Sequence, residues 1–109
     1  MVAFFMFMKY YIYILHSVKH DKFYIGYTTD INKRLTRHNT TPFKTFTSKY
    51  RPWEIYALFE VGKEKAIAIK LEKYIKKQKS RSLLIRLGDC TFIPNGELAQ
   101  LVRVPHVRD

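Results

Sequence analysis

Two short runs of aromatic and β-branched residues constrain this chain most. The first is Tyr10–Leu15 (YYIYIL) and the second is Phe23–Tyr27 (FYIGY), and a mostly polar segment, residues 16–22, separates them. Such residues suit a pleated, half-buried surface, and a short polar connection between two such runs favours a β-hairpin. We therefore expect an antiparallel hairpin at the centre of the fold, with its tyrosines as the first candidates for chemistry.

The rest of the sequence predicts helices and one further strand around this hairpin. Residues 28–30 offer N-cap side chains for a short helix over residues 31–38. A run rich in aromatic and branched residues predicts a third strand over residues 53–61. An uninterrupted helix-forming run predicts the longest helix over residues 63–79, and residues 80–88 carry the cap and the terminal glycine of another. The fold class is α+β (α/β), with a small three-stranded antiparallel sheet flanked by about three helices in ββαβαα order.

The length of 109 residues allows one domain with one modest core. We assign this domain to residues 9–88, with an N-terminal extension over residues 1–8. From residue 89 onward no periodic pattern is visible and prolines and glycines favour turns, so residues 89–109 are predicted to form an irregular tail. Residues 96–103 resemble a tRNA gene's D-arm read as protein, which raises the hypothesis that this tail is non-native read-through.

The charge of the chain favours a polyanionic partner. Lys and Arg number 20 against 9 Asp and Glu, which gives a formal net charge of +11. Such an excess promotes contacts with phosphates and the release of counterions from nucleic acid. The alternative is that the basic residues only keep a small protein in solution.

Cysteine usage and hydropathy limit the cellular context. A single cysteine, Cys90, excludes an internal disulfide and a cysteine-rich zinc site, and it fits a reducing cytoplasm. The apolar run over residues 1–15 is interrupted by Lys9 and is too short to span a bilayer. We expect a cytoplasmic protein with no membrane partner.

A basic and aromatic segment, residues 39–52, is predicted to be a loop after the first helix. This composition suits a grip on a phosphate backbone and stacking on exposed bases. The alternative is that its aromatic residues anchor a long loop to the core. The residues concerned are Lys44, Lys49 and Arg51 with Phe43, Phe46 and Tyr50.

The order of several polar and aromatic residues resembles a known family. The series consists of Tyr11-Ile12-Tyr13, then Tyr24-Ile25-Gly26, then Arg34, His38-Asn39 and a helical Glu72. It resembles the GIY-YIG nuclease domain in its small stand-alone bacterial form, which is similar to the N-terminal domain of excinuclease C. The resemblance covers residues 9–87, and the first glycine of the name motif is Tyr11 here.

The resemblance implies roles for individual residues. Tyr13 takes the place of the tyrosine that helps to activate the attacking water, and Tyr24 that of the second-motif tyrosine. Arg34 matches the arginine that contacts the scissile phosphate, and His38 occupies a position held by Tyr or His in relatives. Glu72 matches the single metal-binding carboxylate, which implies one divalent ion, Mg²⁺ or Mn²⁺. Residues predicted to contact nucleic acid are Gly26, Lys44, Lys49, Arg51, Lys76 and Lys77.

Phosphodiester hydrolysis needs a deprotonated water and compensation for charge that develops on the phosphate. A free tyrosine with a pKa of about 10 is a poor base, and we expect Arg34 and a metal to lower the pKa of Tyr13. His38 is the alternative base or a relay to Tyr13. Structural roles compete with these: strand tyrosines are commonly core residues, and Glu72 is spaced to pair with Lys76 at i,i+4.

The sequence thus favours a metal-dependent endonuclease that hydrolyses DNA phosphodiester bonds, acting on branched or damaged DNA. The alternative is a non-catalytic nucleic-acid-binding module on the same fold. A third interpretation is a protein-interaction adaptor that uses the aromatic loop, and RNA stays open as a substrate.

Overall fold

The computed structural model describes residues 8–105 and 107. Of the expected N-terminal extension, residues 1–7 lie outside this range. The strands are β1 (Tyr11–Ser17), β2 (Lys22–Thr28), β3 (Glu54–Glu60) and β4 (Val102–Arg103). The helices are α2 (Ile31–Thr40), α3 (Phe46–Lys49), α4 (Lys65–Gln78) and α5 (Arg81–Leu87), followed by the 3₁₀ turn η1 (Gly96–Leu98).

The predicted hairpin is confirmed, and the sheet is wider than expected. Its strand order is β2-β1-β3-β4, and all neighbours are antiparallel. The predicted three-stranded sheet was wrong by one strand, because β4 pairs with β3 and places Arg103 opposite Phe59. A strand of two residues shows no alternation in a sequence, and the pairing that forms it is non-local. The predicted loop over residues 39–52 also needs correction, because it contains the short helix α3. The capping box that Thr45 and Ser48 form at the start of α3 is a local signal in the sequence.

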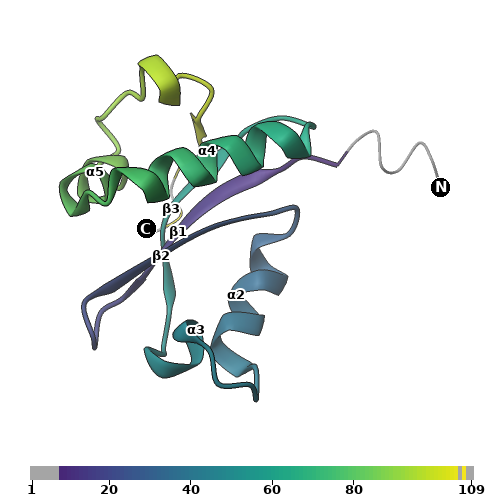
Figure 1. The fold of residues 1–109 in the computed structure, drawn as a ribbon, viewed down its shortest axis with the longest axis vertical. Coiled ribbons are helices and arrows are strands. Elements are labelled where there is room, and N and C mark those ends of the chain that lie inside the picture. Colours follow the sequence, from purple (N-terminus) through teal and green to yellow (C-terminus); the bar gives the residue numbers. More distant parts are fainter. Residues whose placement is uncertain (1–7, 106, 108–109) are drawn as a thin grey trace.

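The two faces of the sheet carry separate helical layers (Figure 1). Successive strand residues point to opposite faces, so Ile12, Ile14 and Phe59 pack in one cluster with residues of α4. Tyr13 and Leu15 face the other way, in a cluster that includes residues of α2. Between these layers β2 forms one edge of the sheet. Side chains from both layers can therefore meet beside β2.

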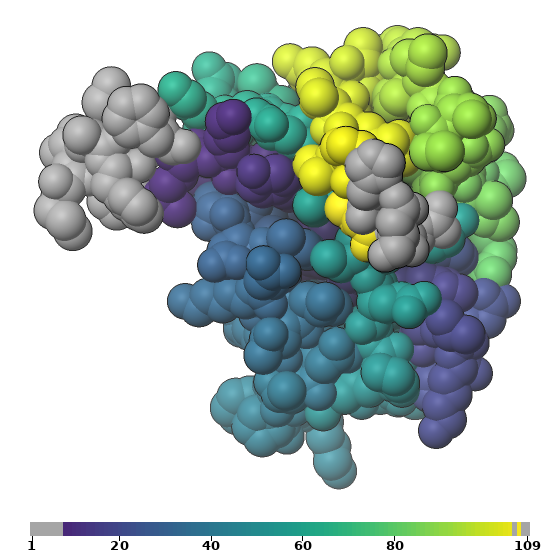
Figure 2. Space-filling view, turned by 180° about the vertical axis from the view of Figure 1, so that it is seen from behind, coloured from purple at the N-terminus to yellow at the C-terminus, as the bar shows by residue number. Residues whose placement is uncertain are grey.

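The C-terminal segment takes part in the core, although the sequence predicted an irregular tail. Leu98 and Leu101 are buried among the residues on the α4 side of the sheet. The backbone N–H of Val104 donates to the carbonyl oxygen of Leu58 at 2.9 Å, which continues the attachment to β3. In Figure 2 the yellow C-terminal residues lie against teal residues from the middle of the chain. Within the described part of the chain, no helix is both long and apolar enough to cross a membrane.

Candidate active site at the β2 edge

A cleft of about 450 Å³ lies beside the edge strand β2, where the α2 and α4 layers approach each other. Most of the residues predicted for catalysis line this cleft, although they come from four different elements. The predicted residues that line it are Tyr13 of β1, Tyr24 and Gly26 of β2, Arg34 of α2, and Glu72 and Lys76 of α4. Their convergence is a tertiary effect, because the chain separates Tyr13 from Glu72 by two strands and two helices.

Gly26 creates the space that Tyr13 occupies. The two residues are cross-strand partners in the β1–β2 ladder. A Cβ atom on residue 26 would lie 2.3 Å from the Tyr13 Oη and 2.4 Å from its Cζ. The ring therefore extends across β2 only because residue 26 has no side chain. The sequence predicts that Gly26 lets a phosphate come near; the structure shows that it lets the Tyr13 ring come near, and a phosphate contact stays a prediction.

Tyr13 and His38 form a buried pair at the base of this site. The Tyr13 Oη lies 2.9 Å from the His38 Nε2, and Tyr13 is 0% exposed. Burial, followed by the charges of Arg34 and Arg37, lowers the pKa of His38 to about 4. The imidazole is therefore neutral at neutral pH. In the tautomer that carries its proton on Nδ1, the His38 Nε2 accepts a hydrogen bond from the Tyr13 hydroxyl, and in the other tautomer it donates one.

The expected lowering of the Tyr13 pKa is wrong for the protein on its own. Burial is the largest effect and the neighbouring Tyr24 adds to it, so the pKa of Tyr13 rises to about 12. The charge of Arg34 does act in the expected direction, but it is the smaller effect. Tyr13 is thus a neutral phenol at neutral pH. Any activation as a base requires further positive charge in the cleft.

Helix α2 delivers both Arg34 and His38, which lie four residues apart on it. The Asp30 carboxylate begins this helix by accepting from the Lys33 backbone N–H. At its other end the Arg51 Nε donates to the His38 carbonyl oxygen at 2.9 Å, and the Arg51 guanidinium also donates to the Thr41 carbonyl oxygen. Arg51 therefore fixes the turn that carries His38, and its predicted contact with nucleic acid stays a prediction.

A second pair of hydrogen bonds fixes the same helix end, and sequence reasoning assigned no role to the residues that make it. The Asn39 side chain donates to the Trp53 carbonyl oxygen at 3.0 Å and accepts from the Trp53 N–H at 2.7 Å. Asn39 directly follows His38, so this bond connects the site to the start of β3. The adjacency of an asparagine to His38 was the only signal of this role in the sequence.

Glu72 faces the cleft from α4 and is paired there. Its Oε1 accepts from the Lys76 Nζ at 3.0 Å, and its side chain is 17% exposed. The Lys76 Nζ also lies over the Tyr24 ring, 5.7 Å from the centroid. The i,i+4 pairing, which the sequence offers as the structural alternative for Glu72, is therefore present. The metal-binding role of Glu72 stays a prediction. Within residues 8–105 and 107, no group of three or more His, Cys, Asp or Glu is placed to hold a metal.

The remaining predicted nucleic-acid contacts lie outside the cleft. Lys44 and Lys49 are exposed on the segment around α3, and Lys77 is exposed on α4. None of the three lines the cleft, and the Lys49 Nζ lies over the Tyr50 ring, 5.4 Å from its centroid. Their contact with nucleic acid stays a prediction.

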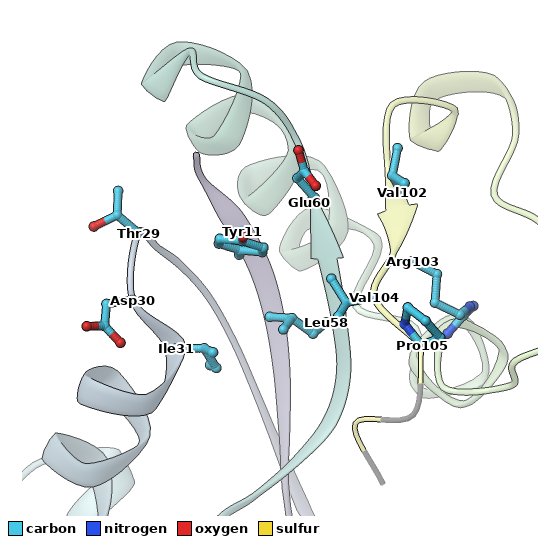
Figure 3. Close-up of a pocket in the computed structure, with 10 residues that line it drawn as sticks. All are labelled: Tyr11, Thr29, Asp30, Ile31, Leu58, Glu60, Val102, Arg103, Val104 and Pro105. Atoms are coloured by element: carbon cyan, nitrogen blue, oxygen red, sulfur yellow. The ribbon is translucent and has the colours of Figure 1, made fainter. Parts of the chain in front are cut away.

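Another cleft, of about 510 Å³, lies on the α2 side of the sheet between the start of α2 and the C-terminal segment (Figure 3). Figure 3 shows Ile31, Tyr11 and Leu58 next to one another in it. Its two carboxylates are already engaged, because Asp30 caps α2 and Glu60 pairs with Lys9 at 3.1 Å. The β2-edge cleft therefore remains the better candidate for chemistry.

Comparison with known proteins agrees with this geometry. A sequence profile described as the GIY-YIG catalytic domain matches residues 9–84. A UPF0213 protein of Streptococcus pyogenes serotype M3 (strain ATCC BAA-595 / MGAS315) is 41% identical over 75 residues, which cover 68% of this chain and 78% of that protein. A UPF0213 protein of Streptococcus pyogenes serotype M5 (strain Manfredo) is 40% identical over the same length and coverage. The matched range spans most of the chain and includes all the predicted residues that line the cleft. This protein therefore belongs to the GIY-YIG family of nuclease-type domains.

Proposed function

We propose that this protein is a metal-dependent endonuclease that hydrolyses phosphodiester bonds of DNA, with branched or damaged DNA as its substrate. One observation supports this most: Tyr13, whose hydroxyl lies 2.9 Å from the His38 Nε2, lines the same cleft as Arg34 and Glu72. A core role for Tyr13 does not need a basic ring nitrogen at its hydroxyl, nor an arginine and a carboxylate beside it.

The chain's own residues divide the work of hydrolysis. In this mechanism the Tyr13 hydroxyl accepts a proton from water while its own proton moves to Nε2 of the His38 tautomer that is protonated on Nδ1. Because Tyr13 is 0% exposed in the protein alone, neighbouring side chains must move before water reaches its hydroxyl. Because the pKa of Tyr13 is about 12 and that of His38 about 4, this transfer is unfavourable in the resting protein. The guanidinium of Arg34 binds the phosphate and compensates the charge that develops on it.

The residues present fit one hard divalent ion held by few protein ligands. Glu72 is a carboxylate in a cleft that Arg34 also lines, so an ion there would complete its shell with water and phosphate oxygens, as Mg²⁺ prefers. When bound, such an ion supplies positive charge that polarises the phosphate and lowers the pKa of nearby acids. Only Glu72 among the predicted residues would hold it.

One observation favours the second candidate function, a non-catalytic nucleic-acid-binding module. The Lys76 ammonium pairs with Glu72 at 3.0 Å and already neutralises the carboxylate that a metal would need. In a binding module this pair would persist, and Arg34 would bind phosphate without turnover. In the nuclease, Lys76 must release Glu72 when the metal arrives.

The deciding experiment incubates pure protein with labelled duplex, flap, junction and single-stranded DNA in Mg²⁺, Mn²⁺ or EDTA. We expect metal-dependent products, loss of these products in Glu72→Ala, and nearly unchanged salt-sensitive DNA binding by that variant. Glu64→Ala is the matched control, because Glu64 lies exposed at the N-cap of the same helix and makes no capping hydrogen bond. Binding without products on any substrate would overturn the nuclease in favour of the binding module.

A further inference from the structure

An aromatic cavity adjoins the candidate active site on the α3 side. It has a volume of about 260 Å³ and lies between α2 and the segment that contains α3, two elements that pack together in Figure 1. Its lining includes Tyr24 and Arg34, which also line the β2-edge cleft. The two hollows therefore adjoin each other at these two residues.

Two aromatic side chains that line this cavity are open to solvent. Phe43 is 73% exposed and Phe46 is 48% exposed. Large exposed aromatic side chains that gather at a hollow mark a binding surface more often than a solvated one. The sequence left two alternatives open for this segment, and the exposure of Phe43 favours contact with a partner. Phe46 serves both, because it is half-exposed and also packs against Tyr50 and the buried Trp53.

The rings are oriented as a platform for stacking. The planes of Phe46 and Tyr24 are within 27° of parallel, with centroids 6.2 Å apart. Tyr24 in turn meets the His38 ring edge-on at 4.9 Å, so the platform begins directly beside the buried Tyr13–His38 pair. Arg34 lines the same cavity, so a flat group on this platform would lie near a phosphate bound by Arg34.

The positive charge around the cavity favours a ligand that carries phosphate groups. Arg34 and Arg37 line it, and among the described residues that line it none is acidic. Flat aromatic surfaces together with cations are the combination that binds single strands, where bases stack and phosphates are neutralised. An apolar peptide offers no negative charge to pair with the two arginines. A peptide that binds through its acidic side chains offers no flat group to stack on the aromatic rings.

We infer that this cavity is a subsite for an unstacked nucleobase next to the scissile phosphate, so that the preferred substrate carries an unpaired or flipped-out nucleotide. This inference rests on the proposed function and specifies its substrate class. A base inside an intact duplex has both faces covered by its neighbours and cannot enter the cavity. Bulges, mismatches, branch points and single strands present such a base at a lower cost of unstacking than an intact duplex.

The test compares two DNAs that differ only in one unpaired 2-aminopurine, which is a base whose fluorescence is quenched on stacking. Wild-type protein in EDTA, where hydrolysis is suppressed, is titrated with a fully paired duplex and with the bulged duplex. We expect tighter binding of the bulged DNA with quenching. We also expect Phe43→Ala and Phe46→Ala to weaken that binding by about 5- to 100-fold while affecting the paired duplex little.

Ile85→Ala is the matched control, because Ile85 is also 48% exposed but lies on α5. Phe46→Ala can destabilise the fold, because Phe46 contacts Tyr50 and Trp53. Phe43→Ala tests the same cavity without that risk, because Phe43 is mostly in solvent. Equal affinity for both DNAs without quenching, or unchanged binding in both variants, would overturn the subsite and leave the surface to a protein partner.

The outcome separates the subsite from the proposed activity. Metal-dependent cleavage of the paired DNA, together with no quenching of the bulged DNA, would overturn the subsite and keep the nuclease. Quenching that depends on Phe43 and Phe46, without cleavage under any metal, would keep the subsite and overturn the nuclease.

Discussion

Substitution of Gly26 by alanine is the sharpest test of how the site is built. The new Cβ would lie 2.3 Å from the Tyr13 Oη and 2.9 Å from its Cε2, closer than real Cβ contacts. Tyr13 is fully buried and bonded to His38, so its ring has little room to retreat. Either the ring shifts away from His38 or the β1–β2 ladder spreads.

The magnitude follows from two effects. Overpacking a well-packed interior costs about 1–3 kcal/mol. Loss of the hydrogen bond between Tyr13 and His38 adds about 1 kcal/mol. We therefore expect Gly26→Ala to lower the free energy of unfolding by about 2–4 kcal/mol and, at roughly 4 °C per kcal/mol, to lower Tm by roughly 8–16 °C.

Gly88→Ala provides a control with a similar clash elsewhere. A Cβ on residue 88 would lie 2.0 Å from the Cε2 of Tyr56, and neither residue lines the β2-edge cleft. Urea denaturation should show a loss of stability in both variants. Metal-dependent nicking, measured well below both melting temperatures, should be lost only in Gly26→Ala. A Gly26→Ala protein with wild-type stability and nicking would refute the conclusion that this glycine makes room for Tyr13.

Three further predictions concern the surroundings of the site. Because the pKa of His38 is about 4 in the folded protein against an ordinary value of 6.5, the unfolded chain binds the proton first, and stability should fall as pH drops from about 6.5 to about 4. The loss is at most about 3–4 kcal/mol at 1.36 kcal/mol per pKa unit. Urea titrations should show a smaller loss in His38→Gln, and equal pH slopes in the two proteins would contradict this. Arg51→Ala should cost about 1–3 kcal/mol in thermal melts by releasing the carbonyl oxygens at the end of α2, whereas unchanged stability would mean that these bonds contribute nothing. Lys76→Met should free Glu72 and tighten Mn²⁺ binding about two- to fivefold by calorimetry without DNA, and unchanged affinity would remove the competition between ammonium and metal.

Much of the fold could be predicted from local patterns in the sequence. The aromatic hairpin, the third strand and the two helices after it follow from alternation, caps and glycines close in sequence, and the structure has them within a few residues of the predicted ranges. What the sequence did not show was non-local. Strand β4 exists only because two residues pair with the end of β3, and Leu98 and Leu101 are buried only because α4 and the sheet leave space for them.

The same division holds for the candidate site. The identities of Tyr13, Arg34, His38 and Glu72 were readable from their order, because the resemblance depends on spacing along the chain. Their ionisation was not: the sequence placed Arg34 near Tyr13 and led to a lowered pKa, whereas burial raises the pKa of Tyr13 to about 12.

The sequence by itself determined which chemical groups are present and which secondary structures carry them, since both depend on neighbours a few residues away. Only the tertiary structure decided that Gly26 makes room for Tyr13, that Arg51 fixes the turn of His38, and that Lys76 covers Glu72. The physical reason is that desolvation and steric exclusion depend on which atoms surround a group, and those atoms come from elements far apart in the chain.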